Sequence, residues 1–405
     1  APDSVQNNNH ISNYLGFLAL ICGLRRYYVH HCNQARRADA MRIALNGLTA
    51  LKAWRSIRSG KAARATIGKR ASLAMPDPSP AQRWMPRCFD LGLLGLDDVP
   101  SKGRPIHVAV PEARLRIRTA GVTCTTYTKL PEYAFVEVGG GIQIACPELV
   151  FLEMGLQMTP IVQLLLGYEL CGTYSRDPLD PRSGDVTYSL DPLTTSESIA
   201  AFARGCGRIH GAAQSREMLA HVLPNAWSPM EALVAALLEL DHGHLGYDLG
   251  PLELNPRVQT GEKSTRVPDI LFTGTRLGIN YDSSMHLDDR SRLVDDKRRT
   301  RELLSAGVSV LPMTSEDLSE KGGFDRLARQ VMDFLEASEG RGVSRQRAFW
   351  ARKRVQKERQ ELIWSLMPGN RGVRMSREAA GAEATEPWGI VEVELPPVRA
   401  AQPRN

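Results

Sequence analysis

The stretch RVPDILFTGTRLGINYDSSMH, Arg266 to His286, contains two apolar runs of strand length, VPDILF and RLGINYD. Asp269 opens the first run, Asp282 closes the second, and His286 follows four residues later. Since side chains alternate along a strand, residue 280 and Asp282 share one face. The stretch predicts a hairpin that brings acidic side chains together at one edge of a sheet.

Such a cluster has a chemical use, because clustered carboxylates hold Mg²⁺ against a phosphate oxygen and a water molecule. Asp269 and Asp282 are the metal ligands that this pattern predicts. Glu231, on a preceding helix, supplies a further carboxylate. Asn280 stands between the two aspartates where a third carboxylate is expected, and it carries an amide oxygen without a charge.

The sequence around this hairpin alternates helical and strand patterns. SPMEALVAALLEL, residues 228–240, opens with a capping residue and a proline in its first turn, which is typical of a helix start. The strand-like run PLELNPRV follows, then the hairpin, a polar helix near 290–305, the strand VSVLPM and a helix from about Ser315. This order indicates an α/β sandwich.

Upstream, residues 47–222 form a second mixed region, and residues 1–46 stay unassigned. LTALKAWRSIRS, residues 48–59, has the apolar spacing of an amphipathic helix. Short alternating runs between residues 106 and 144 predict strands, and the sequence after Cys146 predicts apolar helices. The predicted fold class is therefore mixed α/β (α+β).

The C-terminal part of the chain is basic. Residues 344–367 predict one basic amphipathic helix, and residues 376–405 have the composition of a disordered tail. The net charge is +6 with a pI near 9.0, and positive charge is concentrated in residues 25–70 and 341–374. Because basic segments displace counterions from a phosphate backbone, DNA is the predicted partner. The side chains predicted to contact it are Arg352, Lys353, Arg354 and Lys357. A solvated helix face is the alternative.

Membrane and secreted classes are not favoured. The longest apolar run near the start, Tyr14 to Leu24, is too short for a membrane span, so no membrane partner is expected. The seven cysteines are odd in number, scattered and never in a CxxC pair. A cytoplasmic location fits this usage of cysteine.

The segments SPMEALVAALLEL, LELNPRV, VPDILF, LGINYDSSMH and DDKRRTRELLSAGVSVLPMT together resemble the domain related to very-short-patch-repair endonucleases, in the PD-(D/E)xK superfamily. This resemblance covers about residues 225 to 320, and the domain is placed at residues 223–335. Upstream, ALKAWRS, residues 107–127, IQIACPELVFLEM and GYELCGTY resemble bacterial proteins similar to AbiEi, the antitoxin and repressor of type IV toxin–antitoxin systems. No winged helix is recognisable in residues 1–45.

The resemblance implies a restriction-endonuclease-like fold, a role in defence or toxin–antitoxin regulation, and a cognate toxin as a further partner. It places the metal-site acids on Asp269, position 280 and Asp282, with Glu231 on the helix and His286 near the reacting phosphate. Asn280 replaces the glutamate that this branch carries. Two functions therefore stay open: a Mg²⁺-dependent DNA endonuclease, and a non-enzymatic antitoxin or repressor that uses the nuclease fold for binding or dimerisation. A third is an interaction protein without a nucleic-acid partner.

Each site residue also has a structural interpretation. Glu231 fits the third helical position of a capping box with Ser228. Asp269 fits the start of a strand, Asp282 the turn after one, and His286 a surface histidine. The pair Asp296 and Arg299 has an ordinary helical ion-pair spacing. The oligomeric state has no sequence signal.

Overall fold

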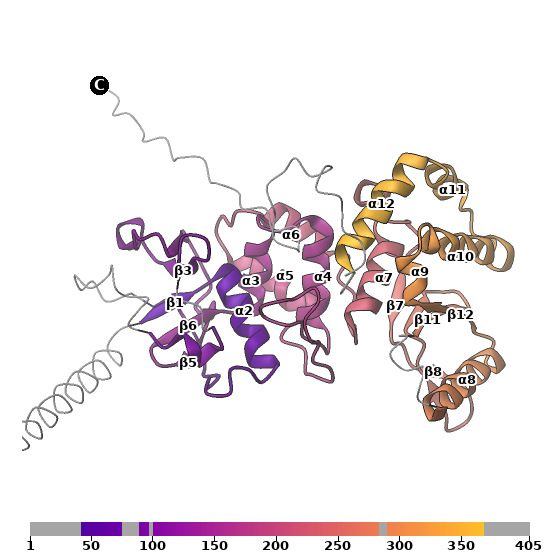
Figure 1. Ribbon diagram of the computed structural model, residues 1–405, viewed down its shortest axis with the longest axis horizontal. Coiled ribbons are helices and arrows are strands. Elements are labelled where there is room, and N and C mark those ends of the chain that lie inside the picture. The colour runs from indigo at the N-terminus through magenta and orange to yellow at the C-terminus, as the bar shows by residue number, and fades with distance from the viewer. Residues whose placement is uncertain (1–41, 75–88, 97–99, 283–289, 368–405) are drawn as a thin grey trace, which may run out of the picture.

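The computed structural model describes residues 42–74, 89–96, 100–282 and 290–367, with side chains in the last range from residue 295 onward. This part of the chain is elongated, with a sheet in each half and helices between the two sheets (Figure 1). The predicted mixed α/β class is confirmed. His286 and residues 376–405 lie outside the described residues, as do residues 1–41 of the unassigned N-terminal segment.

The N-terminal half is built on a six-stranded mixed sheet in the order β2-β5-β6-β1-β3-β4. Three of its strand pairs are antiparallel, while β1 pairs with β6, and β3 with β4, in parallel. The strands are β1 (Ile43–Leu45), β2 (Arg70–Ala71), β3 (Ile106–Val110), β4 (Val122–Thr126), β5 (Phe135–Gly139) and β6 (Ile142–Ala145). The strands predicted between residues 106 and 144 are thus present.

Strand β1 was not predicted, because residues 1–46 were left unassigned. Its three residues are buried and lie centrally in the sheet, between β6 and β3. The partners of β1 lie about 60 and 100 residues further along the chain. A three-residue strand held by such distant partners leaves no local pattern to read.

Helices cover this sheet and continue toward the C-terminal half (Figure 1). Two of them, α3 and α4, begin with a proline in the first turn, as the first-turn geometry favours. The helices of this half are α2 (Gly47–Arg58), α3 (Pro147–Met154), α4 (Pro160–Cys171), α5 (Ser196–Gly205) and α6 (Ala212–Leu219). Helix α4 packs against α7 of the next half, and one connected cluster of buried apolar side chains runs through both halves.

The C-terminal half contains a four-stranded sheet in the order β12-β11-β10-β7. Strands β7, β10 and β11 pair in antiparallel fashion, whereas β12 is parallel to β11. In chain order its core elements are α7 (Pro229–Glu239), β7 (Leu252–Leu254), β10 (Ile270–Phe272), β11 (Leu277–Asp282), α8 (Arg290–Ser305) and β12 (Ser309–Thr314). The order of helix, strands, helix and strand is the one that the sequence predicted, and the structure adds that the last strand is parallel to its neighbour.

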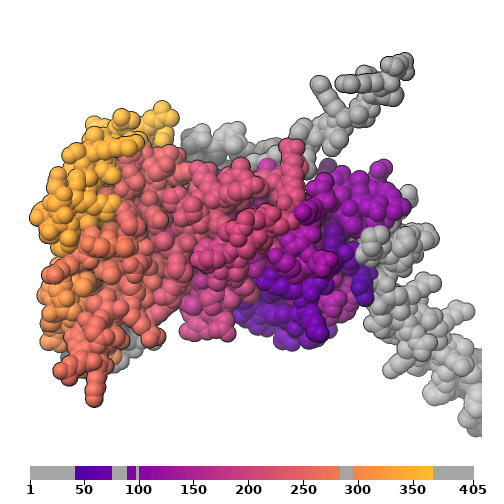
Figure 2. All heavy atoms as spheres, turned by 180° about the vertical axis from the view of Figure 1, so that it is seen from behind, coloured from indigo at the N-terminus to yellow at the C-terminus, as the bar shows by residue number. Residues whose placement is uncertain are grey.

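A small hairpin, β8 (Val258–Gln259) and β9 (Thr265–Arg266), lies beside α8 and contacts it. The two together project from one end of the molecule (Figure 1). In Figure 2 the same projection is seen from the opposite side, at the lower left. The site described below lies where this projection joins the sheet.

The last helices of the described chain are α9 (Ser315–Ser319), α10 (Gly323–Glu339), α11 (Ser344–Trp350) and α12 (Lys353–Leu366). The prediction of one continuous helix over 344–367 is wrong, because the chain is extended at Arg352. Arg359 lies over the Trp350 ring, 3.2 Å from its centroid. Nine residues of continuous helix span about 13 Å, so this stacking requires a break between the two residues.

The described helices include none that is both long enough and apolar enough to span a membrane.

Candidate functional site

The candidate site is centred on Asp269, which directly precedes β10. Ile270 of β10 lies opposite Ile279 of β11, so Asp269 and Asn280 face each other across the two strands. The Asp269 backbone N–H donates to Asn280 Oδ1 at 3.3 Å, and the Tyr281 N–H donates to Asp269 Oδ2 at 2.6 Å. Asp269 and Asn280 are 9% and 4% exposed. The hairpin therefore brings these two side chains together, as predicted.

Glu231 reaches the site from α7. Its backbone N–H donates to the Ser228 hydroxyl at 3.2 Å, which is the capping contact that the sequence predicted. Its carboxylate turns elsewhere: Glu231 Oε2 accepts from Asn255 Nδ2 at 2.8 Å and from the Trp227 N–H at 3.1 Å. Asn255 also donates its backbone N–H to the Asp269 carbonyl, at 2.9 Å. Asn255 thus hydrogen-bonds both the Glu231 carboxylate and the backbone carbonyl of Asp269.

Arg299 of α8 supplies a positive charge to this acidic cluster. Its Nη1 lies 3.7 Å from Asp269 Oδ1, and its Nη2 lies 3.6 Å from Asp296 Oδ1. The side chain is only 26% exposed, and its Nε has no hydrogen-bond partner among the described residues. The predicted surface pair with Asp296 is present, but the guanidinium also faces the buried carboxylate of Asp269.

Asp282 ends β11 and is exposed. The pairing of β11 with β12 places it opposite Thr314. Partial desolvation, together with the nearby carboxylate of Asp296, raises the pKa of Asp282. Its side chain is therefore part of the same acidic edge as Asp269, on the solvent side of it. His286 lies outside the described residues.

Burial governs the electrostatics of the cluster. Desolvation, followed by the negative charge of Glu231, raises the pKa of Asp269 to about 7. Arg299 and the Tyr281 N–H oppose this rise. Desolvation likewise raises the pKa of Glu231, against the hydrogen bonds from Asn255 and Trp227. Asp269, whose pKa is raised to about 7, is therefore partly protonated near neutral pH.

This raised pKa predicts a pH-dependent stability. Between about pH 4 and pH 7 the folded protein binds more protons at Asp269 than the unfolded chain does, so its stability falls as the pH rises through that window. We expect Asp269→Asn to raise the unfolding free energy at pH 8 by about 1–3 kcal/mol. At pH 4 the gain should vanish.

Urea unfolding of both proteins at pH 4 and pH 8 measures this difference. Asp90→Asn is the matched control, because Asp90 is an exposed aspartate paired with Arg64 far from the cluster. An Asp269→Asn protein that is less stable than the wild type at pH 8 contradicts the expectation.

The donor atoms present do not fit a divalent cation. Among residues 42–74, 89–96, 100–282 and 295–367, no group of three or more His, Cys, Asp or Glu side chains is arranged to hold a metal ion. One oxygen of Asp269 accepts from a backbone N–H, and Arg299 faces the other. Mg²⁺ needs several hard oxygen ligands with negative charge. The Mg²⁺ expectation therefore stays a prediction without support from the described side chains.

The cations predicted to contact DNA lie on α11–α12, at the opposite end of this half from α8 (Figure 1). Arg354 pairs with Glu358 and Lys357 with Glu361 along the same helix, and Arg352 lies over the Phe349 ring. The charge of this helix is therefore partly neutralised by its own carboxylates.

The projection formed by α8 and the β8–β9 hairpin, called the α8 projection below, has fewer of its positive charges neutralised by ion pairs. Its exposed cations without an ion pair among the described residues are Arg257 and Lys263 of the hairpin segment and Lys297 and Arg301 of α8. Lys297 and Arg301 are four residues apart, so they share one face of the helix. Arg266 and Arg298 both pair with Glu302, and the pair with Arg266 joins the hairpin to α8.

Two residues of the site were missed from the sequence. Arg299 was predicted as part of the helical motif shared with the endonuclease-like domain and as an ion-pair partner of Asp296, but not as a partner of Asp269, and Asn255 was not singled out. The spacing of Asp296 and Arg299 gave no sign of Asp269, because that contact depends on how α8 packs beside the hairpin. Asn255 had a weak signal, since an asparagine before a proline interrupts the strand pattern of residues 251–258.

Comparisons of this chain with protein-family models, with curated proteins and with solved structures found no match. The site must therefore be interpreted from its own geometry.

Proposed function

We propose that this chain is a nucleic-acid-associated protein whose C-terminal half binds DNA without cleaving it. One observation carries the proposal. The guanidinium of Arg299 lies against Asp269, where a nuclease would need a metal ion, and the neutral Asn280 fills the neighbouring ligand position. A carboxylate already countered by an arginine has less charge to offer a divalent cation.

The order of elements supports a nuclease-like ancestry for this half. Helix α7, strands β7, β10 and β11, helix α8 and parallel strand β12 follow the succession expected for a restriction-endonuclease-like core. Glu231, Asp269 and position 280 lie on α7, at the start of β10 and on β11, as the resemblance implies. We propose that the framework of the nuclease site has been kept and its metal chemistry lost.

The DNA surface that we propose is the α8 projection. Lys297 and Arg301 are exposed and have no carboxylate partner among the described residues, unlike Arg354 and Lys357 of α12. Unpaired cations release more counterions from a phosphate backbone than cations already held in ion pairs. Such contacts orient a protein on DNA and carry no sequence preference by themselves.

The DNA surface is tested by salt-dependent binding. We expect duplex DNA to bind the full chain, with a log–log salt slope that weakens by about 2 in Lys297→Gln/Arg301→Gln, since each lost phosphate contact removes about 0.9. The affinity at low salt should fall about tenfold. Fluorescence anisotropy at a series of NaCl concentrations measures both quantities.

The matched variant is Arg354→Gln/Lys357→Gln, which removes the same charge from α12. If this variant loses as much DNA affinity as Lys297→Gln/Arg301→Gln or more, the DNA surface lies on α12, as the sequence predicted. Binding that does not depend on salt would contradict the DNA-binding proposal. The remaining candidate would then be an interaction protein without a nucleic-acid partner.

The second candidate is a metal-dependent DNA endonuclease, favoured by the coupling of the buried carboxylates Glu231 and Asp269. Supercoiled plasmid incubated with the wild type and Mg²⁺ or Mn²⁺ separates the two candidates. We expect no nicking. Nicking by the wild type that Asp269→Ala abolishes would overturn the non-cleaving proposal. A toxin partner and a role in repression remain part of the same proposal on the resemblance to AbiEi alone.

A further inference from the structure

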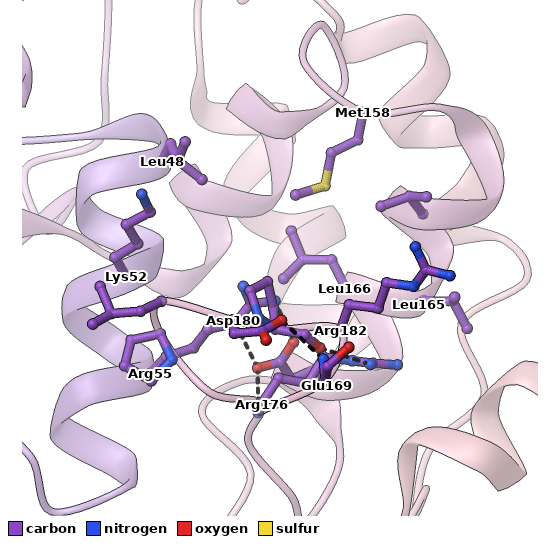
Figure 3. Close-up of a pocket in the computed structure, with 15 residues that line it drawn as sticks. Leu48, Lys52, Arg55, Met158, Leu165, Leu166, Glu169, Arg176, Asp180 and Arg182 are labelled. Atoms are coloured by element: carbon purple, nitrogen blue, oxygen red, sulfur yellow. Dashed lines mark hydrogen bonds and ion pairs between the residues drawn. The ribbon is translucent and has the colours of Figure 1, made fainter. Parts of the chain in front are cut away.

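A pocket of about 470 Å³ lies in the N-terminal half, away from the carboxylate cluster. Helices α2 and α4 and the segment 176–183 line it (Figure 3). This volume is within the range of small-molecule sites, about 300–1,000 Å³. The pocket takes no part in the function proposed above, and its occupant is a separate question.

Most of the lining is apolar. The apolar wall is made by α2, the segment before α4, and α4, with five side chains: Leu48, Met158, Val162, Leu165 and Leu166. Leu179 also lines the pocket and is 66% exposed. An apolar wall together with an exposed leucine favours a ligand with an apolar body.

The carboxylates of the lining are already engaged. Glu169 is buried and accepts two hydrogen bonds from Arg55, at 2.9 and 2.7 Å, and one from the Arg176 N–H at 3.0 Å. Asp180 accepts from the Ser183 N–H at 2.9 Å. Neither acid forms an ion pair with Lys52 or Arg182.

Two cations of the lining, Lys52 and Arg182, have no carboxylate partner among the residues that the structure describes. Arg182 donates from Nε and Nη2 to the carbonyl oxygens of Met367 and Trp364, at 3.0 and 2.9 Å, and these bonds hold its guanidinium on α12. Lys52 is half-buried beside Leu48 and has no hydrogen bond or ion pair to any described residue (Figure 3). Its ammonium group keeps all three donors for a ligand.

The segment that closes the pocket is held in place before any ligand arrives. Asp177 Oδ1 accepts the N–H groups of Leu179 and Asp180, both at 2.8 Å, and Asp177 also pairs with Lys61. Arg176 Nη1 donates to the Pro181 carbonyl at 3.1 Å. A preorganised wall reduces the entropy that binding would otherwise lose.

We propose that this pocket binds a small amphipathic anion, with its acidic group on Lys52 and its apolar body against Leu165 and Leu166. The apolar wall and Leu179 match the apolar body of such a molecule, and the unpaired ammonium of Lys52 matches its acidic group. A neutral apolar ligand would leave the Lys52 ammonium without a partner. A small hydrophilic anion would leave the apolar wall exposed to water.

The test uses decanoate as the probe, 1-decanol as its neutral analogue and acetate as the headgroup alone, each titrated calorimetrically into the full chain. We expect decanoate to bind about tenfold more tightly than decanol, and acetate not to bind measurably. Lys52→Met keeps the aliphatic stem and removes the charge, so it should reduce decanoate affinity to that of decanol. Lys129→Met, an exposed lysine outside the pocket, should leave binding unchanged.

Val162→Phe narrows the apolar wall and should weaken decanoate and decanol alike, with a thermal melt to confirm that the variant is folded. The proposal is overturned if millimolar decanoate does not bind the wild type. It is also overturned if Lys52→Met binds decanoate as the wild type does, or if folded Val162→Phe does.

Discussion

The double variant Asn280→Glu/Arg299→Gln is expected to bind Mn²⁺ about a hundredfold more tightly than the wild type, which corresponds to about 2.8 kcal/mol. The change adds one carboxylate between Asp269 and Asp282 and removes the guanidinium that lies 3.7 Å from Asp269 Oδ1. Glutamate at position 280 also retains an oxygen that can accept the Asp269 N–H, as Asn280 Oδ1 does now at 3.3 Å. Each half of the change raises the negative charge available to the cation.

Calorimetric titration with Mn²⁺ measures this gain, and a thermal melt checks that the larger side chain at the buried position 280 is tolerated. The matched control is Asn280→Glu/Arg299→Lys, which keeps a cation beside Asp269 and should gain much less affinity. A wild type that binds Mn²⁺ as tightly as the double variant shows that Arg299 does not substitute for a metal ion. The non-cleaving function would then lose its main support.

The layout of this site was predictable because each of its helices and strands is specified by residues close together in the sequence. The apolar runs 267–272 and 276–282 alternate as strands do, and the serine and proline before Met230 mark a helix start. These local signals placed Glu231 on α7, Asp269 directly before β10 and Asn280 on β11, where the structure has them. The hairpin register then follows from burying Ile270 and Ile279 on the same side.

The charge state of the site was not predictable, because it depends on packing between elements. Arg299 and Asp269 are 30 residues apart, and their contact exists only because α8 returns beside the hairpin. The pKa of Asp269 rises through burial and through Glu231, neither of which a sequence pattern reports. The sequence thus located the acids and left open whether they hold a metal ion.

The break between α11 and α12 is a second long-range effect. Residues 344–367 carry an uninterrupted helical pattern, and nothing local in it forbids a single helix. Arg359 lies within the basic segment 341–374, yet its side chain is 1% exposed. A cation that the sequence assigns to solvent is therefore part of the core.

Arg359→Met is expected to lower the unfolding free energy by about 3–5 kcal/mol, the usual cost of removing one partner of a buried charge pair. Arg359 pairs with Asp325, donates to the Tyr247 hydroxyl at 2.6 Å and donates from Nε to the Leu245 carbonyl at 3.0 Å. Its guanidinium also lies over the rings of Trp350 and Tyr247. Methionine fills much of the volume but leaves the Asp325 carboxylate with the Tyr247 hydroxyl alone.

Urea unfolding at constant pH measures the loss, and Arg354→Met is the matched control on the same helix. Arg354 is exposed, and among the described residues its ion pair is with Glu358 alone, so its removal should leave the unfolding free energy close to that of the wild type. Arg359→Met/Asp325→Asn should recover part of the loss, because no charge is then left without a partner. Equal stability of Arg359→Met and Arg354→Met would mean that α12 is held by its apolar side chains alone, and that Arg359 is as replaceable as the cations on its exposed face.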